Sequence, residues 1–79
     1  MTIIEERRAL GRALISGDIS ALPDTWERAA HNDIARAMGV LNEYGRKVDL
    51  VTVHGMLKDL SGYSPAYLAG LPDDVEDVE

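Results

Sequence analysis

The chain has 79 residues, no cysteine and a formal net charge of −6. A chain of this length builds one small hydrophobic core, so we expect a single domain. Without cysteine, neither disulfide bonds nor thiolate zinc sites contribute to its stability. The first residues lack the basic start and apolar stretch of a secretory signal peptide, and no apolar run is long enough to cross a bilayer. We therefore expect a soluble, cytoplasmic protein with no membrane contact.

The negative charge is concentrated at the carboxyl end. Five of the 14 acidic residues lie in residues 73–79, so residues 1–72 hold nine acidic and eight basic residues. A domain that binds a phosphate backbone normally displays clustered Lys and Arg. This body has only a short basic stripe of Arg7, Arg8 and Arg12. Direct nucleic-acid binding is therefore disfavoured, and residues 73–79 are predicted to be a disordered acidic tail.

The first predicted helix begins near Ile3 and ends at Gly17. Thr2 and Glu5 have the Thr-x-x-Glu spacing of a capping box, and a glycine after the last helical residue can adopt the left-handed conformation. Gly11 inside this helix favours close approach of another helix, since glycine otherwise costs about 1 kcal/mol relative to alanine. The apolar face is expected to consist of Ile3, Leu10, Ala13 and Leu14.

Residues 18–26 are predicted to be a connector with one anchoring side chain. Asp18 or Ser20 can cap a brief turn before Pro23. Trp26 is the only tryptophan. Tryptophan is enriched at binding hot spots, but in so small a core burial is the favoured interpretation.

A central helix pair is predicted over residues 29–44 and 50–60. In the first helix Ile34, Ala37, Met38 and Leu41 recur at i, i+3, i+4 and i+7, and Gly45 follows as a stop. In the second, either Asp49 or Thr52 serves as N-cap. Its apolar positions are Val53, Met56, Leu57 and Leu60. We expect the two helices to pack antiparallel.

The last predicted helix starts at Ser64-Pro65, a capping residue followed by proline at the first helical position, and ends at Gly70 and Pro72. The sequence thus predicts an all-α fold, a small orthogonal or antiparallel bundle of four or five short helices. Residues 1–72 form the domain and residues 73–79 the tail.

No catalytic, cofactor or metal site is predicted. His31 and His54 lack ligands at metal-binding spacing, and each has one charged residue four positions away, Glu27 and Lys58 respectively. A structural or exposed role is therefore favoured for both histidines. The serines lie at helix ends and turns, where they cap backbone donors. A paired-carboxylate enzyme would need a substrate cleft that so short a chain hardly provides, and we expect no enzymatic activity.

A string from His31 to Leu57 is similar to a known family. It contains, in order, His31, Ile34, Gly45, Val48, Asp49, Leu50, Val51, Thr52 and Val53. The string resembles the amino-terminal domain of DnaB-type replicative DNA helicases, whose His-x-x-Ile helix is followed by Gly-x-x-(Ile/Val)-Asp-Leu-(Ile/Val)-Thr and a further helix. Three outer segments extend the likeness over roughly residues 5–71: Glu6 to Gly11, Thr25 to Arg28, and Gly62 with Tyr67, Leu68 and Ala69.

The chain also departs from the family pattern. Trp26 replaces a smaller aromatic residue, Ala35 replaces an aromatic residue, and Lys47 stands where proline is common. The family's helical hairpin and motor domain are not found in these 79 residues, nor is a Gly-x-x-x-x-Gly-Lys-Ser/Thr phosphate loop. ATP hydrolysis and unwinding are therefore not implied by the resemblance.

The resemblance implies a protein-interaction module of DNA replication. Domains of this family pack with one another in the helicase ring and help to receive primase or a loader. The chain is then either a fragment of a helicase or a free-standing relative, for instance one encoded by a phage. We expect protein partners, a possible homo-oligomer, and partner contacts through Arg8, Arg12, Tyr44 and Tyr63, with His31 structural. The alternative is a small acidic inhibitor or nucleic-acid mimic that acts through residues 73–79 on a basic partner.

Overall fold

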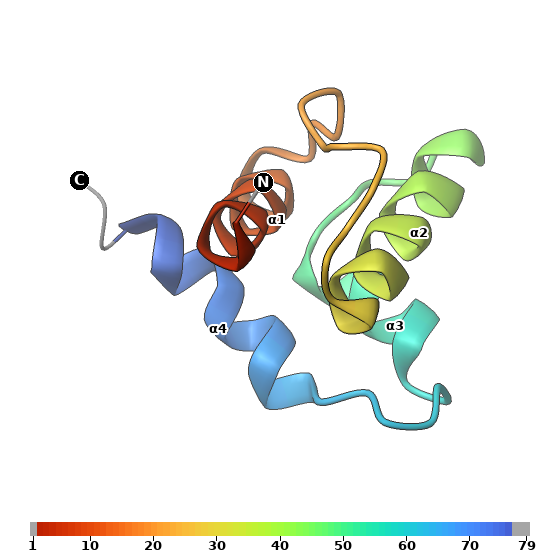
Figure 1. Cartoon of the computed structure of the whole chain (residues 1–79). Helices are drawn as coiled ribbons and strands as arrows, with labels where there is room; N and C mark the ends of the chain where they lie inside the picture. The colour runs from red at the N-terminus through yellow and green to blue at the C-terminus, as the bar shows by residue number, and fades with distance from the viewer. Residues whose placement is uncertain (1, 77–79) are drawn as a thin grey trace.

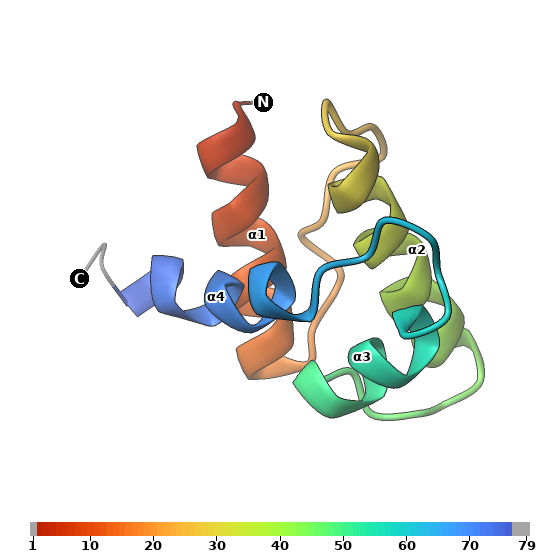
Figure 2. The same ribbon diagram turned by 90° about the horizontal axis from the view of Figure 1, so that it is seen from below.

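The computed structural model describes the backbone of residues 2–76 and the side chains of residues 2–72. Its elements are α1 (Ile3–Ser16), α2 (Ala29–Glu43), α3 (Leu50–Leu57) and α4 (Pro65–Glu76). Helix α4 crosses α1 at a steep angle, and α2 and α3 lie on the other side of the molecule (Figures 1 and 2). Helix α1 packs most extensively against α4, and α2 against α3. The predicted all-α class is confirmed.

Local capping explains where the helices begin. The Thr2 hydroxyl accepts the Glu5 N–H and the Glu5 carboxylate accepts the Thr2 N–H, which completes the predicted capping box of α1. Asp49 and Thr52 form the same reciprocal arrangement at α3, so the N-cap is Asp49. Ser64 accepts the Tyr67 N–H at the start of α4, as its position before Pro65 predicts.

Two predicted helix stops are confirmed by backbone conformation. Gly17 after α1 has φ +78° and Gly45 after α2 has φ +70°. Both values lie in the left-handed region, which residues with a Cβ rarely adopt. The connector between α1 and α2 contains the predicted short turn, in which Ser20 N–H donates to the Asp18 carboxylate.

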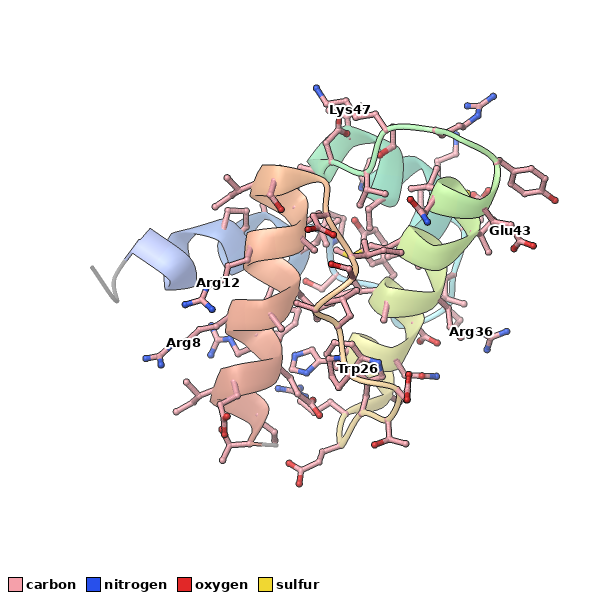
Figure 3. All side chains as sticks on the ribbon, turned by 90° about the horizontal axis from the view of Figure 1, so that it is seen from above. Arg8, Arg12, Trp26, Arg36, Glu43 and Lys47 are labelled. Atoms are coloured by element: carbon pink, nitrogen blue, oxygen red, sulfur yellow. The ribbon has the colours of Figure 1, made fainter. Side chains whose placement is uncertain are left out.

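Side chains from all four helices form one apolar core. The Trp26 indole is half-buried against it, between α1 and α2 (Figure 3), as the sequence predicts. Gly11 is buried on the face of α1 that packs inward. The buried apolar residues are Leu10, Ala13, Leu14, Ile34, Ala37, Met38, Leu41, Val48, Val53, Leu57, Leu68 and Leu71.

Three side chains predicted to be buried are exposed. Ile3 is 39 % exposed, because α4 crosses the later half of α1 and leaves its first turn uncovered (Figure 2). Met56 and Leu60 are 45 % and 43 % exposed. Helix α3 ends at Leu57, where the Leu60 N–H donates to the carbonyl of Leu57 in a tighter turn. This turn ends the helical register through which Leu60 was expected to reach the core.

The predicted end of the last helix is also wrong. Helix α4 continues through Gly70 and Pro72 to Glu76, so it enters the segment expected to be a disordered tail. Leu68 and Leu71 are fully buried against the core. Burial of Leu71 favours continuation of the helix past Gly70, and a proline removes only its own N–H bond and strains one turn. The remaining tail residues, 77–79, lie outside the described residues.

Candidate functional site

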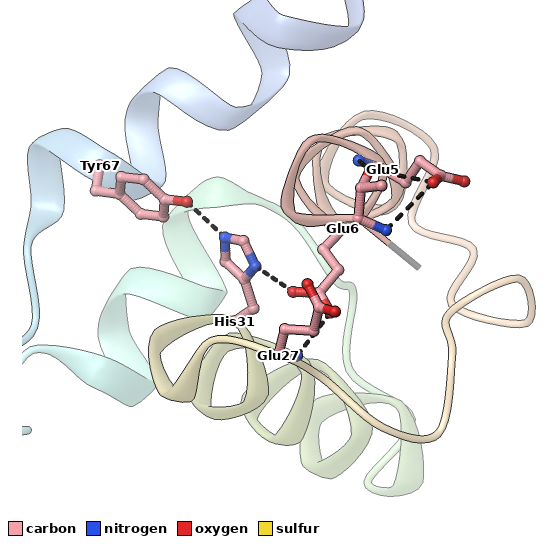
Figure 4. Close-up of polar contacts among 6 residues, drawn as sticks. Glu5, Glu6, Glu27, His31 and Tyr67 are labelled. Carbon is pink, nitrogen blue, oxygen red and sulfur yellow. Dashed lines mark hydrogen bonds and ion pairs between the residues drawn. The ribbon is translucent and has the colours of Figure 1, made fainter.

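The most concentrated polar chemistry in the described chain is a buried network of Glu6, His31 and Tyr67. The three residues come from α1, α2 and α4, and Figure 4 shows their side chains converging. Glu6 Oε1 lies 2.8 Å from His31 Nδ1, and His31 Nε2 contacts the Tyr67 hydroxyl. Glu6 is 1 % exposed and His31 is fully buried. The carboxylate that pairs with His31 is thus that of Glu6, and not that of Glu27 four positions away.

Glu6 also holds the backbone just before α2. Its second oxygen, Oε2, accepts the Glu27 N–H at 2.7 Å. Glu27 immediately precedes Arg28, the N-cap residue of α2, so this hydrogen bond fixes the chain where it enters the helix. Burial would raise the pKa of Glu6, but the hydrogen bonds from His31 and from the Glu27 N–H hold that pKa below its ordinary value. The carboxylate is therefore ionised at neutral pH.

One proton position follows from this ionisation. A carboxylate only accepts hydrogen bonds, so His31 Nδ1 donates to Glu6. His31 Nε2 accepts from the Tyr67 hydroxyl in a neutral imidazole and donates to it in an imidazolium. Around this axis the Trp26 ring meets His31 edge-on at 6.2 Å between centroids, and the guanidinium carbons of Arg7 and Arg28 lie 5.7 and 5.4 Å from the centre of the Tyr67 ring.

The order carboxylate, imidazole, hydroxyl is one that hydrolases use, but the burial differs. No part of His31 reaches solvent, and general acid–base catalysis requires the imidazole to exchange a proton with a bound substrate. The network instead joins α1, α2 and α4 through hydrogen bonds that are completed inside the protein. Its geometry supports the structural role predicted for His31.

A hollow of about 430 Å³ lies beside Tyr67, between the start of α2, the end of α3 and the turn before α4. Tyr63 lines it, and the Tyr63 hydroxyl lies 2.7 Å from Nδ1 of the exposed His54. Partial burial raises the pKa of Tyr63. The polar partner of His54 is thus Tyr63, nine positions away in the sequence. Arg28 and Asp33 place opposite charges at this hollow.

Tyr44 occupies a different place. It lines a groove of about 410 Å³ between the end of α2 and α3, together with Val40 and Met56. Tyr44 is 77 % exposed, and Val40 and Met56 are 36 % and 45 % exposed. Arg46 adds a positive charge to the lining. We refer to Val40, Tyr44, Arg46 and Met56 as the α2–α3 groove.

Arg8 and Arg12 lie on a third surface. Figure 3 shows both side chains leaving α1 on the side that faces away from α2. Neither guanidinium makes a hydrogen bond or ion pair with the described residues. The four residues predicted to bind a partner are thus spread over three surfaces.

Sequence reasoning missed two features. The role of Glu6 had no local signal, because its partner His31 lies 25 positions away. The exposure of Ile4 and Ile15, each 59 % exposed, did have a signal. Both isoleucines lie on the helical face of Arg8 and Arg12, opposite Leu10 and Leu14.

Comparison with known proteins gives no identification. The chain matches no family, and no curated protein or solved structure is detectably similar to it. Among the described residues there is no group of three or more His, Cys, Asp or Glu side chains suited to a metal ion. The same part of the chain has no helix whose length and apolar character would let it cross a membrane.

Proposed function

We propose that this chain is a non-catalytic protein-interaction module of DNA replication, with a role similar to that of the amino-terminal domain of DnaB-type helicases. In this role it binds primase, a loader or a replicative helicase subunit. The proposal rests on the sequence resemblance of the His31–Leu57 string. One structural observation supports it: most residues of that string have a structural role in the fold, which leaves other surfaces free to meet a partner.

The role of each string residue can be stated. His31 joins three helices through its buried ring, and Gly45 makes the left-handed turn after α2. Asp49 and Thr52 cap α3 reciprocally, and Val53 is fully buried. Ile34 and Val48 are buried in the core, whereas Leu50 and Val51 are exposed. A shared fold requires structural roles at the majority of positions of such a string.

The α2–α3 groove is the surface that best suits the partner. Its exposed apolar side chains border Tyr44, whose ring offers a large contact area and whose hydroxyl can hydrogen-bond. Tyrosine and arginine are enriched among residues that dominate binding energy, and this groove presents Tyr44 beside Arg46. Two short helices in mutual contact supply a rigid floor for it.

The test is light scattering with the replicative helicase, primase and loader of the organism that encodes the chain. The 8.6 kDa chain is measured first alone, which also reports self-association, and then with each protein. We expect a complex with at least one of them. Replacing a central aromatic hot spot costs 2 kcal/mol or more, so Tyr44→Ala should weaken that complex by about thirtyfold.

Arg36→Ala is the matched control, because Arg36 is exposed on the outer side of α2 (Figure 3) and does not line the groove. It should leave the affinity unchanged. If the chain forms a complex with none of the three proteins, the replication role is wrong. A complex that Tyr44→Ala and Arg36→Ala leave equally strong contradicts the groove as its site.

A second candidate function is that of an acidic inhibitor or nucleic-acid mimic. It is favoured by the continuation of α4 through residues 73–76, which places three acidic positions, Asp73, Asp74 and Glu76, on a helix. Neutralising the five acids of residues 73–79 to Asn and Gln keeps the chain length and separates the two functions. The mimic loses its partner, whereas a module that docks through the α2–α3 groove keeps it.

A further inference from the structure

The outward face of α1 combines apolar and cationic side chains in an unusual way. Ile4 and Ile15 are each 59 % exposed. Arg8 and Arg12 lie between them in the sequence, and neither guanidinium has a hydrogen-bond or ion-pair partner in the described chain. We call Ile4, Arg8, Arg12 and Ile15 the α1 stripe.

Helix geometry places these four residues on one continuous face. At 100° per residue they lie within roughly 80° of the helix circumference and span about 16 Å of its axis. The buried face of α1, with Leu10, Ala13 and Leu14, is on the opposite side. Figure 3 confirms that Arg8 and Arg12 point away from α2. Ile4, Arg12 and Ile15 are exposed and Arg8 is half-buried, so the stripe is accessible to a partner.

The composition of the stripe differs from that of an ordinary solvated helix face. Such a face normally carries Lys and Glu in helical pairs. Here the neighbouring carboxylate on α1 is that of Glu5, whose pKa Arg8 helps to lower, and two large aliphatic side chains lie at the ends of a pair of arginines. Arginine is enriched at protein interfaces and lysine is depleted, because the guanidinium is more weakly hydrated and can bind a carboxylate through two parallel hydrogen bonds. These features are typical of a surface that a protein partner desolvates.

The spacing indicates the chemistry of that partner. Arg8 and Arg12 are one helical turn apart, so they match two carboxylates one turn apart on a facing helix. Ile4 and Ile15, at the two ends of the stripe, suit aliphatic side chains that flank the two carboxylates on the facing helix. We propose that the α1 stripe docks an amphipathic acidic helix of a partner protein. This surface is separate from the α2–α3 groove, so the inference goes beyond the function proposed above.

A phosphate backbone is a poorer occupant. Two arginines are a small charge for nucleic-acid binding, which depends on many phosphate contacts, and the chain as a whole carries a net charge of −6. Phosphate groups would also leave the two isoleucines against a polar, hydrated surface. An acidic helix uses both parts of the stripe, the arginines through charge and the isoleucines through burial.

The test uses a fluorescein-labelled, end-capped alanine-based helical peptide with the pattern Leu-x-x-Glu-x-x-x-Glu-x-x-x-Leu, read by fluorescence anisotropy. The control peptide has Gln in place of both Glu residues. Two exposed ion pairs are expected to make the Glu peptide bind about three- to tenfold tighter than the Gln peptide. This preference should shrink as salt is raised, because exposed charges are screened.

Two double variants of the chain complete the design. Arg8→Gln with Arg12→Gln should abolish the preference for the Glu peptide. Ile4→Ser with Ile15→Ser should weaken both peptides alike. All four positions are at least partly exposed, so circular dichroism should report an unchanged fold. Arg36→Gln is the matched control and should bind both peptides as the wild-type chain does.

Other outcomes overturn the inference. If the two peptides bind equally well, or if the arginine variant binds them as the wild-type chain does, the stripe does not recognise acidic charge. Displacement of the bound Glu peptide by a 20-base-pair DNA duplex assigns the stripe to phosphate. A further outcome is self-association of the chain. If this self-association is lost in the arginine variant and also when the acids of residues 73–79 are neutralised, the occupant of the stripe is a second copy of the chain and not a foreign helix.

Discussion

Replacement of Glu6 by leucine tests whether the buried network stabilises the fold. Leucine fills a similar volume but accepts no hydrogen bond, so His31 Nδ1–H and the Glu27 N–H are both left without their acceptor. Each unsatisfied buried donor costs about 1–3 kcal/mol. Because Glu6 is 1 % exposed, little water can replace the lost contacts. We expect Glu6→Leu to lower the free energy of unfolding by about 2–5 kcal/mol.

Glu6→Gln should be milder. Its amide oxygen can accept the Glu27 N–H, and its NH₂ group can donate to His31 Nδ1 if the imidazole changes tautomer and donates to the Tyr67 hydroxyl. The pattern of hydrogen bonds survives, but two charge-assisted bonds become neutral ones, at a cost of about 1–2 kcal/mol. The expected order of stability is wild type, then Gln, then Leu.

Urea and thermal unfolding followed by circular dichroism measure this order. For a domain of this size 1 kcal/mol corresponds to about 4–8 °C in the melting temperature, so the leucine variant should melt roughly 10–30 °C below the wild type. Glu27→Leu and Glu27→Gln are the matched controls, since the Glu27 side chain is exposed. If Glu6→Leu unfolds within about 0.5 kcal/mol of Glu27→Leu, the network does not stabilise the fold.

Four further predictions follow from the structure. Because the pKa of Glu6 is lowered in the folded state, its stabilisation is complete above the ordinary pKa of 4.5 and is lost as pH falls through the lowered value; the stability difference between wild type and Glu6→Gln, measured by urea unfolding, should therefore shrink below that pH. Tyr67→Phe, which removes the hydroxyl partner of His31 Nε2, should cost about 1 kcal/mol in the same assay. Asp49→Ala removes the cap of α3 and should also cost about 1 kcal/mol, whereas Asp49→Asn should restore most of it. Leu71→Ala should cost about 2–5 kcal/mol, because Leu71 is fully buried, and an effect below about 1 kcal/mol would mean that α4 does not pack as described.

The predictions that succeeded rest on interactions within one helical turn. Thr2 with Glu5, Asp49 with Thr52, and Ser64 with the Tyr67 N–H join residues three positions apart. Periodicity likewise identified the α2 core face, because helical spacing alone brings those side chains together. The family resemblance and the replication role are untested by the comparisons and remain proposals.

The candidate sites were harder to predict. His31 was expected to be structural, but its partners Glu6 and Tyr67 lie 25 and 36 positions away. The four residues expected to meet a partner lie apart, because the fold divides them among α1, the α2–α3 groove and the hollow beside Tyr67. These groupings depend on how the helices are placed relative to one another, and a local sequence pattern does not specify that placement.

The sequence by itself determined where helices begin, which of their faces are apolar and where left-handed glycines end them, because these depend on contacts between near neighbours. Only the tertiary structure decided that α4 continues past Pro72 and that Ile3 and Met56 remain exposed. The same holds for the buried Glu6, which accepts the Glu27 N–H just before α2 and becomes the partner of His31. The physical reason is that burial and long-range hydrogen bonds depend on how the helices cross, and the burial of Leu71, just after Gly70, depends on how α4 packs against α1.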